Sequence, residues 1–598
     1  MENEARRKID LKYKWRIEDI YPTKEAWERE LEELPSLVEK VSSFRGRLGK
    51  DSASFREGMA CYEHMSRQLE KVFLYAKLQK DLDNASPEYQ AMNERALSLL
   101  YTVQEAAAFV LPELTAVEPE RLRSWVQEDG LQDYAHMVDD IIRSRAHVLP
   151  EREEQILAMA SPALETMDNA FTMLDSVDLK RGEVTDEEGH RVPLTDGLYS
   201  RLRDSRDRRV RAEAFEAMHN AFASMGHTIA ALYAGSVRSD VFHARVRDYE
   251  SSLDAALSSD NLPHSIYTGL IEAVHEALPA YYRYLELRRK ALGVEKLHIY
   301  DCYLPIVEAP EEEYTYEKAC DMVKTYLKPL GDAYAADLNR LLAGGWVDVY
   351  ETPGKTTGAY ACDVYGVHPY MLLNFAGTLN DVFTVAHEAG HCLHSYYSDR
   401  QPYINRDYPI FLAEIASTVN ENIVMREMMA ECDMQTEEGR RRRAYLINRY
   451  LEEFKGSVFR QTMFAEFELK AHEMAEKGEP LTPESLCSLY HGLLEQYFGP
   501  AVEIDPYMDW EWARIPHFYS AFYVFKYATG FSAAAAISRR LLDGQGRDSY
   551  LAFLGAGGSD YPAETLKRAG VDMSTPEPMR IALKEFASLV DDLAALMP

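Results

Sequence analysis

The sequence has little cysteine, and none of it lies in a pattern typical of disulfide frameworks or structural zinc sites. Its seven cysteines are scattered over 598 residues, odd in number and free of CxxC pairs. Reduced thiols in a cytoplasmic protein are the natural interpretation, because disulfides persist in oxidising compartments. The segment MENEARRKIDLKYK has no apolar signal core, and no apolar run approaches the length of a membrane span. We therefore expect a soluble, unexported protein.

Positive charge is also scarce. Lysine and arginine number 66 against 98 aspartates and glutamates, which gives a formal net charge of −32. Such a chain is repelled by nucleic-acid phosphates and by anionic lipids, so neither is expected as a partner. The sequence contains no internal repeat and no low-complexity tract, and it leaves the oligomeric state open.

Helical periodicity dominates the chain. Trp27, Leu31 and Leu34 repeat at three to four residues, and similar stripes fill most of residues 50–175. The stretch DLKRGEVTDEEGHRVPLTDG carries glycine, proline and charge, as expected for a small hairpin or a domain boundary. The pattern predicts a mainly α fold with an N-terminal helical lobe over residues 1–190 and a second domain, catalytic by the motif below, over residues 191–598.

The most informative segment is TVAHEAGHCLH, which places His387, Glu388 and His391 in an HExxH spacing. Histidines four apart on a helix are offset by about 40° around the axis and about 6 Å along it. Both imidazoles can therefore bind one Zn²⁺ from the same face, while Glu388 can reach a water on that metal. Asn380 or Asp381 is expected to cap the start of this helix.

A catalytic zinc site has three protein ligands, and the third must come from elsewhere in the chain. The histidine-type extension HExxHxxGxxH fails, because His394 and Tyr397 stand at its glycine and histidine positions. The segment PIFLAEIASTVNENIVMREMM reads as a second helix, in which Glu414 is surrounded by apolar residues. A carboxylate on an apolar face is costly to bury unless it is paired, so we predict that Glu414 points inward as the third ligand. Glu421 could accept the second N–H of a ligand histidine, or be a solvated surface glutamate.

The motif also indicates a reaction. Zinc lowers the pKa of a bound water to about 7, and Glu388 would then be the general base for attack of that water on a carbonyl. Charge developing on the carbonyl oxygen needs hydrogen-bond donors. The segment RIPHFYSAFYVFKYATGF offers His517, Tyr519, Tyr523 and Tyr527 mostly at i+4 spacing, which predicts one helical stripe. A packed core helix is the alternative for so many aromatic residues.

Directly before the metal-binding helix, TGAYACDVYGVHPYMLLNF reads as two extended segments around Tyr365 and Gly366. They predict a small β-sheet beside that helix. The edge of such a sheet could pair with an extended peptide by strand addition, although a purely structural hairpin fits the pattern equally well.

These segments together resemble a known family. HEAGHCLHS, followed by FLAEIASTVNE and IPHFYSAFYVFKYATG, closely resembles oligoendopeptidase F within the thimet oligopeptidase family of zinc metallopeptidases. LKYKWRIEDIYPT near the start and GAGGSDYPAETLKRAGVD near the end are similar as well, so the resemblance spans nearly the whole chain. It implies a two-lobed helical fold around a deep channel with zinc at its base, and an intracellular endopeptidase that cuts short peptides internally and spares folded proteins.

Carried over by motif, the resemblance implies one zinc ion per chain with His387, His391 and Glu414 as ligands. Glu388 matches the family's general base, and Glu421 matches its acidic residue after the third ligand.

The resemblance also places His517, Tyr523 and Tyr527 in the row that binds substrate and the transition state. On the sequence alone, Tyr519 is an equally placed candidate for the tyrosine at the oxyanion.

Two other functions stay open at this point. A dipeptidyl- or carboxypeptidase would need a cation to anchor a terminal carboxylate, and the sequence does not decide between Arg460 and Arg514 for that role. A peptide-binding protein with a defunct site is the other alternative. Against it stands the intact metal-binding set with its adjacent glutamate.

Overall fold

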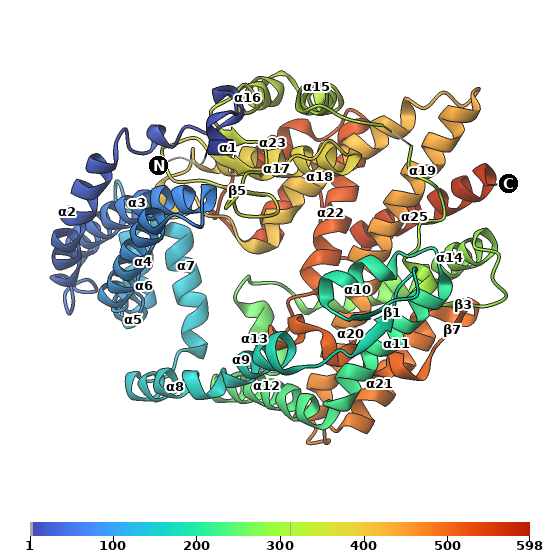
Figure 1. Ribbon diagram of the computed structural model, residues 1–598. Coiled ribbons are helices and arrows are strands. Elements are labelled where there is room, and N and C mark those ends of the chain that lie inside the picture. Colours follow the sequence, from blue (N-terminus) through green and yellow to red (C-terminus); the bar gives the residue numbers. More distant parts are fainter. Residues whose placement is uncertain (1–3, 311, 598) are drawn as a thin grey trace. The chain divides into compact units, whose positions relative to one another are not determined.

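The computed structural model describes residues 4–310 and 312–597 (Figure 1). The predicted mainly α fold is confirmed, because helices account for nearly all the regular structure and the sheets of the described residues have only two or three short strands. The chain divides into two compact units, each built from three separate stretches. Unit 1 comprises residues 1–145, 311–427 and 537–571, and unit 2 comprises residues 146–310, 428–536 and 572–598.

This division differs from the predicted one at residue 190. Hydrophobic periodicity shows which face of a segment is buried, but not which distant segments share that core. Each unit combines three stretches that are separated in the sequence, so no single boundary along the chain divides the two.

Unit 1 contains the amino-terminal helices and those that surround the HExxH motif. Its helices are α1 Glu4–Arg7, α2 Lys24–Ser42, α3 Ser52–Leu82, α4 Pro87–Ala107, α5 Val110–Thr115, α6 Pro119–Trp125, α7 Ala135–Ser144, α15 Tyr316–Tyr326, α16 Asp332–Leu342, α17 Leu379–Ser398, most of α18 Ile410–Ala430, the end of α22 Phe525–Leu542, α23 Arg547–Leu554 and α24 Pro562–Arg568. Of the predicted apolar stripe on α2, Trp27 and Leu34 are fully buried and Leu31 is half-buried against the same core. The Trp27 indole N–H donates to Val72 O of α3 at 2.8 Å.

A three-stranded sheet in unit 1 lies directly before α17, as the sequence predicts. Strand β6 Tyr370–Leu372 is central, pairs parallel with β4 Val347–Asp348 and antiparallel with β5 Tyr360–Cys362, and is fully buried. Gly366 has φ 78°, a left-handed backbone that glycine adopts without strain, in the loop that reverses the chain between β5 and β6. Strand β5 is left at the edge of the sheet, against α17.

Arg406, in the loop after α17, is almost completely buried and forms ion pairs with several carboxylates. Arg406 follows the short helix η8 Tyr403–Asn405, and its Nη2 lies 3.1 Å from Asp363 Oδ2. Its Nη1 lies 3.4 Å from Glu70 Oε2 and 3.6 Å from Asp399 Oδ1. Burial raises the pKa of Asp399, which caps the end of α17, to about 7 against the opposing charge of Arg406. The loop between α17 and α18 is thereby tied to both the sheet and α3.

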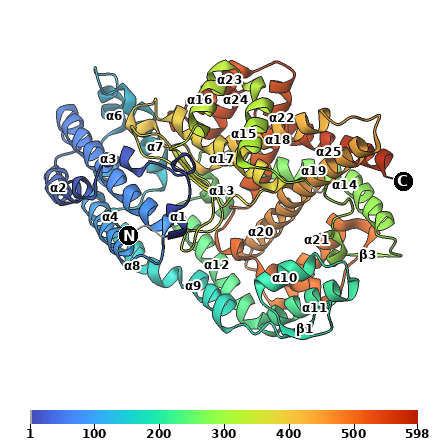
Figure 2. The ribbon, with the colours of Figure 1, turned by 45° about the horizontal axis from the view of Figure 1, so that its top comes forward.

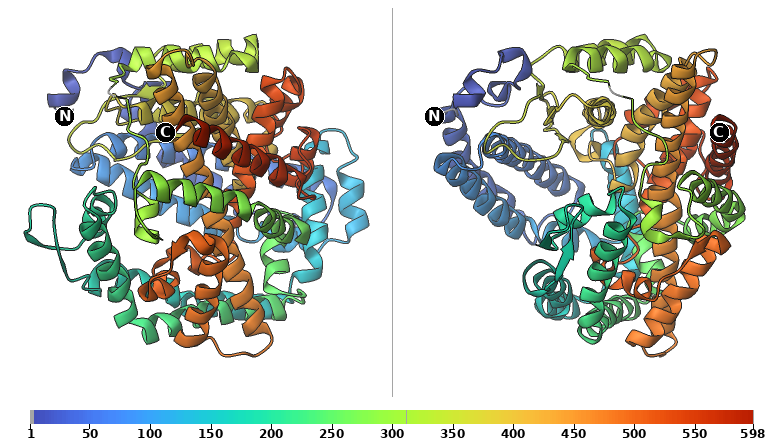
Figure 3. Two further views of the ribbon diagram at one scale, coloured as in Figure 1. Left: turned by 90° about the vertical axis from the view of Figure 1, so that its right-hand side faces the viewer. Right: turned by 45° about the vertical axis from the view of Figure 1, so that its right-hand side comes forward.

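Unit 2 is built around long helices whose buried faces are rich in tyrosine and phenylalanine. Its helices are α8 Glu151–Leu164, α9 Thr166–Met173, α10 Asp196–Arg203, α11 Arg208–Ser224, α12 Gly226–Val246, α13 Ser252–Ser258, α14 His264–Ala291, α19 Glu437–Phe454, α20 Gln461–Glu476, α21 Pro483–Phe498, the start of α22 and α25 Glu577–Leu596. Helices α19 and α20 join through a π-helical turn, η9 Lys455–Arg460, into a long helical run drawn in orange in Figure 3.

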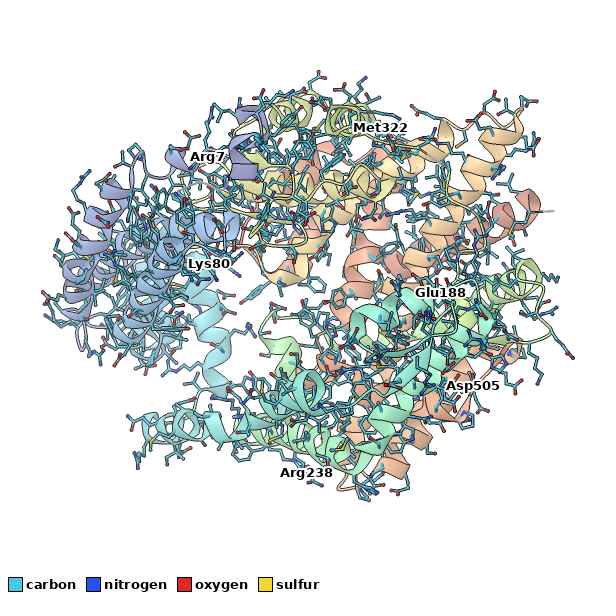
Figure 4. All side chains as sticks on the ribbon, in the orientation of Figure 1. Arg7, Lys80, Glu188, Arg238, Met322 and Asp505 are labelled. Atoms are coloured by element: carbon cyan, nitrogen blue, oxygen red, sulfur yellow. The ribbon has the colours of Figure 1, made fainter. Side chains whose placement is uncertain are left out.

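Two small sheets complete unit 2. Of the two alternatives for the stretch near residue 188, a hairpin or a domain boundary, the hairpin is present: β1 Glu183–Thr185 pairs antiparallel with β2 Arg191–Pro193, and Glu188 at its turn is labelled in Figure 4. Strand β3 Leu297–His298 pairs parallel with β7 Val502–Glu503. Among the described residues of both units, no helix has the length and apolar character needed to cross a membrane.

The raised pKa of Asp399 predicts a pH-dependent stability. Because the folded-state pKa lies above the usual value of about 4, this carboxyl group favours folding most below pH 4, and that contribution is lost as the pH rises through 7. Asparagine cannot ionise. We therefore expect the difference in melting temperature, variant minus wild type, to be more positive for Asp399→Asn at pH 8 than at pH 5. Thermal unfolding at the two pH values measures this difference.

The matched control is Asp321→Asn, because the Asp321 side chain is 79% exposed. It should change the melting temperature equally at both pH values. An equal change for Asp399→Asn at both pH values would contradict the prediction.

Candidate active site

Helix α17 presents the HExxH motif from a well-defined start. Its N-cap is Thr378, two residues before the earliest predicted cap: Thr378 Oγ1 accepts the Asp381 N–H at 3.3 Å, and Asp381 Oδ2 accepts the Thr378 N–H at 2.8 Å. The predicted caps Asn380 and Asp381 were wrong by two or three residues, because Asp381 serves as the third residue of a reciprocal capping box rather than as the cap itself.

Two imidazoles and one carboxylate converge in unit 1. His387 Nε2 and His391 Nε2 lie 3.2 Å apart, and Glu414 Oε2 on α18 lies 3.5 Å from the first and 3.6 Å from the second. Glu414 is not buried as predicted, since its side chain is 52% exposed. Its apolar neighbours Phe411 and Ile415 face the interior, whereas the carboxylate lies on the solvent-facing flank of α18, beside the imidazoles.

The spacing of these three donor atoms fits a zinc ion. Nitrogen and oxygen ligands at about 2.0–2.1 Å from a tetrahedral zinc lie about 3.3–3.4 Å from one another. The observed triangle of 3.2, 3.5 and 3.6 Å agrees with that separation on every side. Two imidazoles with one carboxylate are also a ligand set typical of catalytic zinc. These residues could therefore hold a zinc ion.

Two further glutamates border the triangle. Glu421 Oε2, two turns along α18 from Glu414, lies 3.0 Å from His387 Nδ1 and leaves Nε2 of that ring directed at the other donors. Burial acts to lower the pKa of His387, but the hydrogen bond and charge of Glu421, with the other nearby carboxylates, outweigh it and raise this pKa to about 9. Glu388 is only 6% exposed, and burial raises its pKa.

Helices α17 and α18 are neighbours in unit 1 (Figures 1 and 2). The distance between them is set by two residues that the sequence analysis did not single out, Gly390 and Asn420. A Cβ atom on Gly390 would lie 2.5 Å from the Cα of Ser417 and 2.8 Å from Ala416 O, so only glycine permits this approach. Asn420 is fully buried on α18, and its amide donates to Ala386 O at 3.0 Å. Two features of the sequence could have identified these residues: a glycine between the two histidines of the motif, and an asparagine within an apolar helix.

The neighbours of the motif on α17 do not belong to the donor set. Cys392 is fully buried, and its thiol faces Tyr370 O of strand β6 at 4.0 Å, in agreement with its exclusion as a ligand. His394 is also fully buried and stacks on the ring of Tyr408 with centroids 3.7 Å apart. Burial lowers the pKa of His394 to about 3, so it is a neutral packing residue.

In unit 2, three of the four predicted donors form a cluster. The rings of His517 and Tyr523 are nearly parallel with centroids 6.3 Å apart, and Tyr527 meets Tyr523 edge-on at 5.5 Å. His517 Nε2 lies 3.5 Å from the Tyr527 hydroxyl. His517 is exposed, and the two tyrosines are half-buried. We call these three residues the donor cluster.

The prediction of one helical stripe was wrong. His517 lies on the 3₁₀ helix η12 Pro516–Tyr519, Tyr523 lies in the following turn, and only Tyr527 lies on α22. Regular i+4 spacing therefore did not reflect a regular helix here. The turn, rather than helical periodicity, brings the three side chains together.

Tyr519 differs from the other tyrosines. Its ring stacks on Phe171 of α9 with centroids 4.5 Å apart and meets Tyr233 of α12 edge-on at 6.3 Å. Burial raises its pKa, and its hydroxyl is buried without a hydrogen-bond partner among the described residues. Tyr519 is thus a packing residue, outside the donor cluster.

The two arginines considered as terminal anchors have different surroundings. Arg460 Nη2 donates to Glu511 Oε1 at 2.7 Å, and Glu511 is also held by the Tyr490 hydroxyl. The Arg514 guanidinium lies over the ring of Tyr199, 5.2 Å from its centroid. The charge of Arg460 is therefore already neutralised within the protein.

A second group of possible ligands, Asp186, Glu188 and His190, lies in the turn of the β1–β2 hairpin (Figure 4). Asp186 Oδ1 accepts the backbone N–H of His190 at 2.7 Å, and both Glu188 and His190 are exposed. This arrangement closes the turn and needs no ion.

This chain is similar to known peptidases over nearly its whole length. Residues 201–585 match the profile of Peptidase family M3, and residues 113–180 match that of Oligopeptidase F. Oligopeptidase PepF of Bacillus subtilis is 40% identical over 98% of this chain and 87% of its own length. Group B oligopeptidase PepB of Streptococcus agalactiae is 37% identical over 100% of this chain and 99% of its own.

Solved structures share the fold. The crystal structure of oligoendopeptidase-F from Enterococcus faecium superposes with a TM-score of 0.74 at 35% identity, covering 95% of this chain and 98% of that one. A crystal structure from Chlamydophila abortus superposes with a TM-score of 0.92 at 35% identity over 99% of both chains.

The contact at Gly390 predicts that the spacing of α17 and α18 controls metal binding. Gly390→Ala places a methyl group against the backbone of α18, and overpacking of this kind typically costs about 1–3 kcal/mol. We expect at least about a tenfold loss of zinc affinity in a folded protein, measured by competition with a chromogenic chelator.

The control is Gly492→Ala on α21, where an added Cβ meets no atom within 4 Å. This variant should bind zinc as wild type does. Wild-type zinc affinity in folded Gly390→Ala would show that the helix spacing does not set the ligand geometry.

Proposed function

The chain belongs to peptidase family M3 and is a metallo-oligopeptidase, and from that premise we propose that it is a zinc-dependent endopeptidase that cuts internal bonds of short oligopeptides. The observation that supports this most is the triangle of His387, His391 and Glu414, whose sides match a tetrahedral zinc site. Zinc bound there would polarise the substrate carbonyl and lower the pKa of a water molecule.

Glu388 is proposed as the general base. It takes a proton from the attacking water and passes it to the leaving amine as the peptide bond breaks. Its nearly complete burial excludes competing water from the carboxylate and keeps the proton in place between the two steps.

Glu421 is proposed to orient His387. By accepting the Nδ1 proton, it fixes the tautomer that leaves Nε2 as the metal-binding nitrogen. The close approach of α18 at Gly390 supports this assignment, since Glu414 and Glu421 come from the same helix at a fixed register.

The donor cluster is proposed to bind substrate and to stabilise the oxyanion. The imidazole of His517 and the hydroxyls of Tyr523 and Tyr527 are the donors available for a developing negative charge. Tyr519 is left out of this role because its ring packs on Phe171.

Strand β5 supports an extended peptide as the substrate. It lies at the edge of its sheet and against α17, so a peptide could add to it as a further strand. The pairing of Arg460 with Glu511 removes one of the two cations that could anchor a terminal carboxylate, which favours internal cleavage. We place the enzyme in the cytoplasm, a location supported by the lack of any disulfide among the cysteines of the described residues.

Replacement of Glu388 tests the proposed base. Glu388→Gln keeps the size and hydrogen-bonding capacity of the side chain but removes the proton acceptor. We expect zinc content to stay at about one equivalent while kcat falls by about 10²–10⁴-fold, measured with a quenched fluorescent peptide. Glu414→Ala is the contrasting variant, which should lose zinc first.

Near-normal turnover by zinc-loaded Glu388→Gln would remove Glu388 from the role of base. A zinc-loaded wild-type protein with no activity on any peptide would instead favour the inactive peptide-binding alternative.

Peptides with blocked ends test the position of cleavage. We expect an internally quenched peptide, acetylated at its amino terminus and amidated at its carboxyl terminus, to be cut with a kcat/KM within about threefold of the unblocked peptide. Product masses should identify an internal bond. A strict requirement for a free terminus would make the enzyme a dipeptidyl- or carboxypeptidase, and Arg514→Ala would then test its anchor.

A further inference from the structure

The turn that carries Tyr523 has an unusual backbone. Phe522 has φ 55°, in the left-handed region. The other non-glycine residues of the described chain with positive φ are Asp248 and Asn261, which are types that tolerate this conformation. For a bulky residue such as phenylalanine the conformation is strained, and strain of this kind persists only where the surrounding structure imposes it.

A fully buried carboxyl group holds this backbone in place. Glu468 lies on α20 and is fully buried, and its Oε1 accepts the backbone N–H of Phe522 at 3.1 Å. Burial raises the pKa of Glu468 well above its usual range, so the group acts as a neutral acceptor. Its Oε2 has no hydrogen-bond partner among the described residues. A buried carboxyl group with a single hydrogen-bond partner destabilises the fold. In the described part of the chain, the single partner of the Glu468 side chain is the backbone N–H of Phe522, the residue with the strained backbone.

The ring of Phe522 is fixed as well. It is 2% exposed, meets Tyr267 of α14 edge-on with centroids 5.7 Å apart, and packs on His472 of α20 at 4.5 Å. His472 is itself held, since its Nδ1 lies 2.8 Å from the Glu468 carbonyl oxygen and its Nε2 lies 3.2 Å from Asp240. Helices α14 and α20 thus determine both the backbone and the side chain of Phe522.

This turn sets the direction of the chain immediately before Tyr523. With an ordinary negative φ at Phe522, the following residues would leave in another direction, and Tyr523 would lose its place beside His517 and Tyr527. The ends of the segment have separate attachments, because Tyr519 stacks on Phe171 and Lys526 pairs with Asp260 at 2.9 Å. The Glu468 contact therefore acts on the turn itself rather than on the whole segment.

We propose that Glu468 is a positioning residue of the peptidase, which acts through the N–H of Phe522 to hold Tyr523 within the donor cluster. This inference rests on the proposed function, in which the donor cluster contributes to the transition state. Glu468 lies in the interior of unit 2 and touches no substrate; its effect on the reaction passes through Tyr523.

The experiment compares Glu468→Gln with Glu468→Met. Glutamine keeps a neutral oxygen acceptor in the same place, whereas methionine has similar size and no acceptor. We expect the glutamine variant to keep kcat within about twofold of wild type. The methionine variant should lose kcat by roughly 10- to 100-fold, the effect of misplacing a transition-state group, with KM and zinc content little changed.

A double variant tests the route of the effect. If Glu468 acts through Tyr523, Glu468→Met combined with Tyr523→Phe should lose no more kcat than Tyr523→Phe alone. Multiplying losses would overturn the proposal, as would wild-type kcat in folded Glu468→Met. If Glu468→Met does not fold, Glu468→Asp, which retracts the acceptor by one methylene, takes its place: an intermediate loss of kcat supports the proposal, and wild-type kcat overturns it.

The single variant Tyr523→Phe distinguishes failure of the role proposed for Glu468 from failure of the donor function proposed for Tyr523. A reduced kcat for Tyr523→Phe together with an unchanged kcat for Glu468→Met would overturn only the role of Glu468. Wild-type kcat for Tyr523→Phe would remove Tyr523 from the donor function, and the role of Glu468 would be overturned with it.

Discussion

The close approach of α17 and α18 is the constraint on which the proposed metal centre depends. Without a side chain at Gly390, the backbone of α18 comes near enough for Glu414 to meet two imidazoles of α17 at 3.5 and 3.6 Å. Asn420 then fixes the register by bonding the carbonyl of the residue before His387. The remaining features of unit 1, from the capping box of α17 to the charges around Arg406, hold these two helices where they are.

A different principle organises the donor cluster of unit 2. The triangle of candidate metal ligands is made by two regular helices, whereas His517, Tyr523 and Tyr527 are gathered by a short helix, a strained turn and the start of α22. Regular helices give fixed spacing through packing alone. An irregular segment needs individual contacts, and the buried carboxyl of Glu468 is the contact at its most strained point.

The sequence predicted the mainly helical fold, the hairpin near residue 188 and the small sheet before α17, because each follows from local pattern. It also predicted Glu414 as a candidate ligand, because a carboxylate on an apolar helix face is costly to bury unless it is paired. It predicted two parts but not which segments of the chain form each unit, and it did not predict the exposure of Glu414, because both depend on contacts between distant segments. The prediction that the tyrosines form one helical stripe was wrong for a related reason. Residues on one helical face show i+4 spacing, but that spacing does not make the segment helical, and here Phe522 takes a left-handed backbone.

Strand β5, proposed above as the edge to which a peptide adds, would limit the range of peptides that can bind there. It spans only Tyr360–Cys362, so an added strand could form backbone pairs with just a few consecutive residues of a partner. Main-chain amides are the same in every peptide, and recognition through them ignores the identity of most side chains. A proline within those few residues would remove a donor, and a chain already engaged in its own helices or sheets would have no free amides to offer. A docking edge of this kind would select for conformational freedom in the partner more than for any particular sequence.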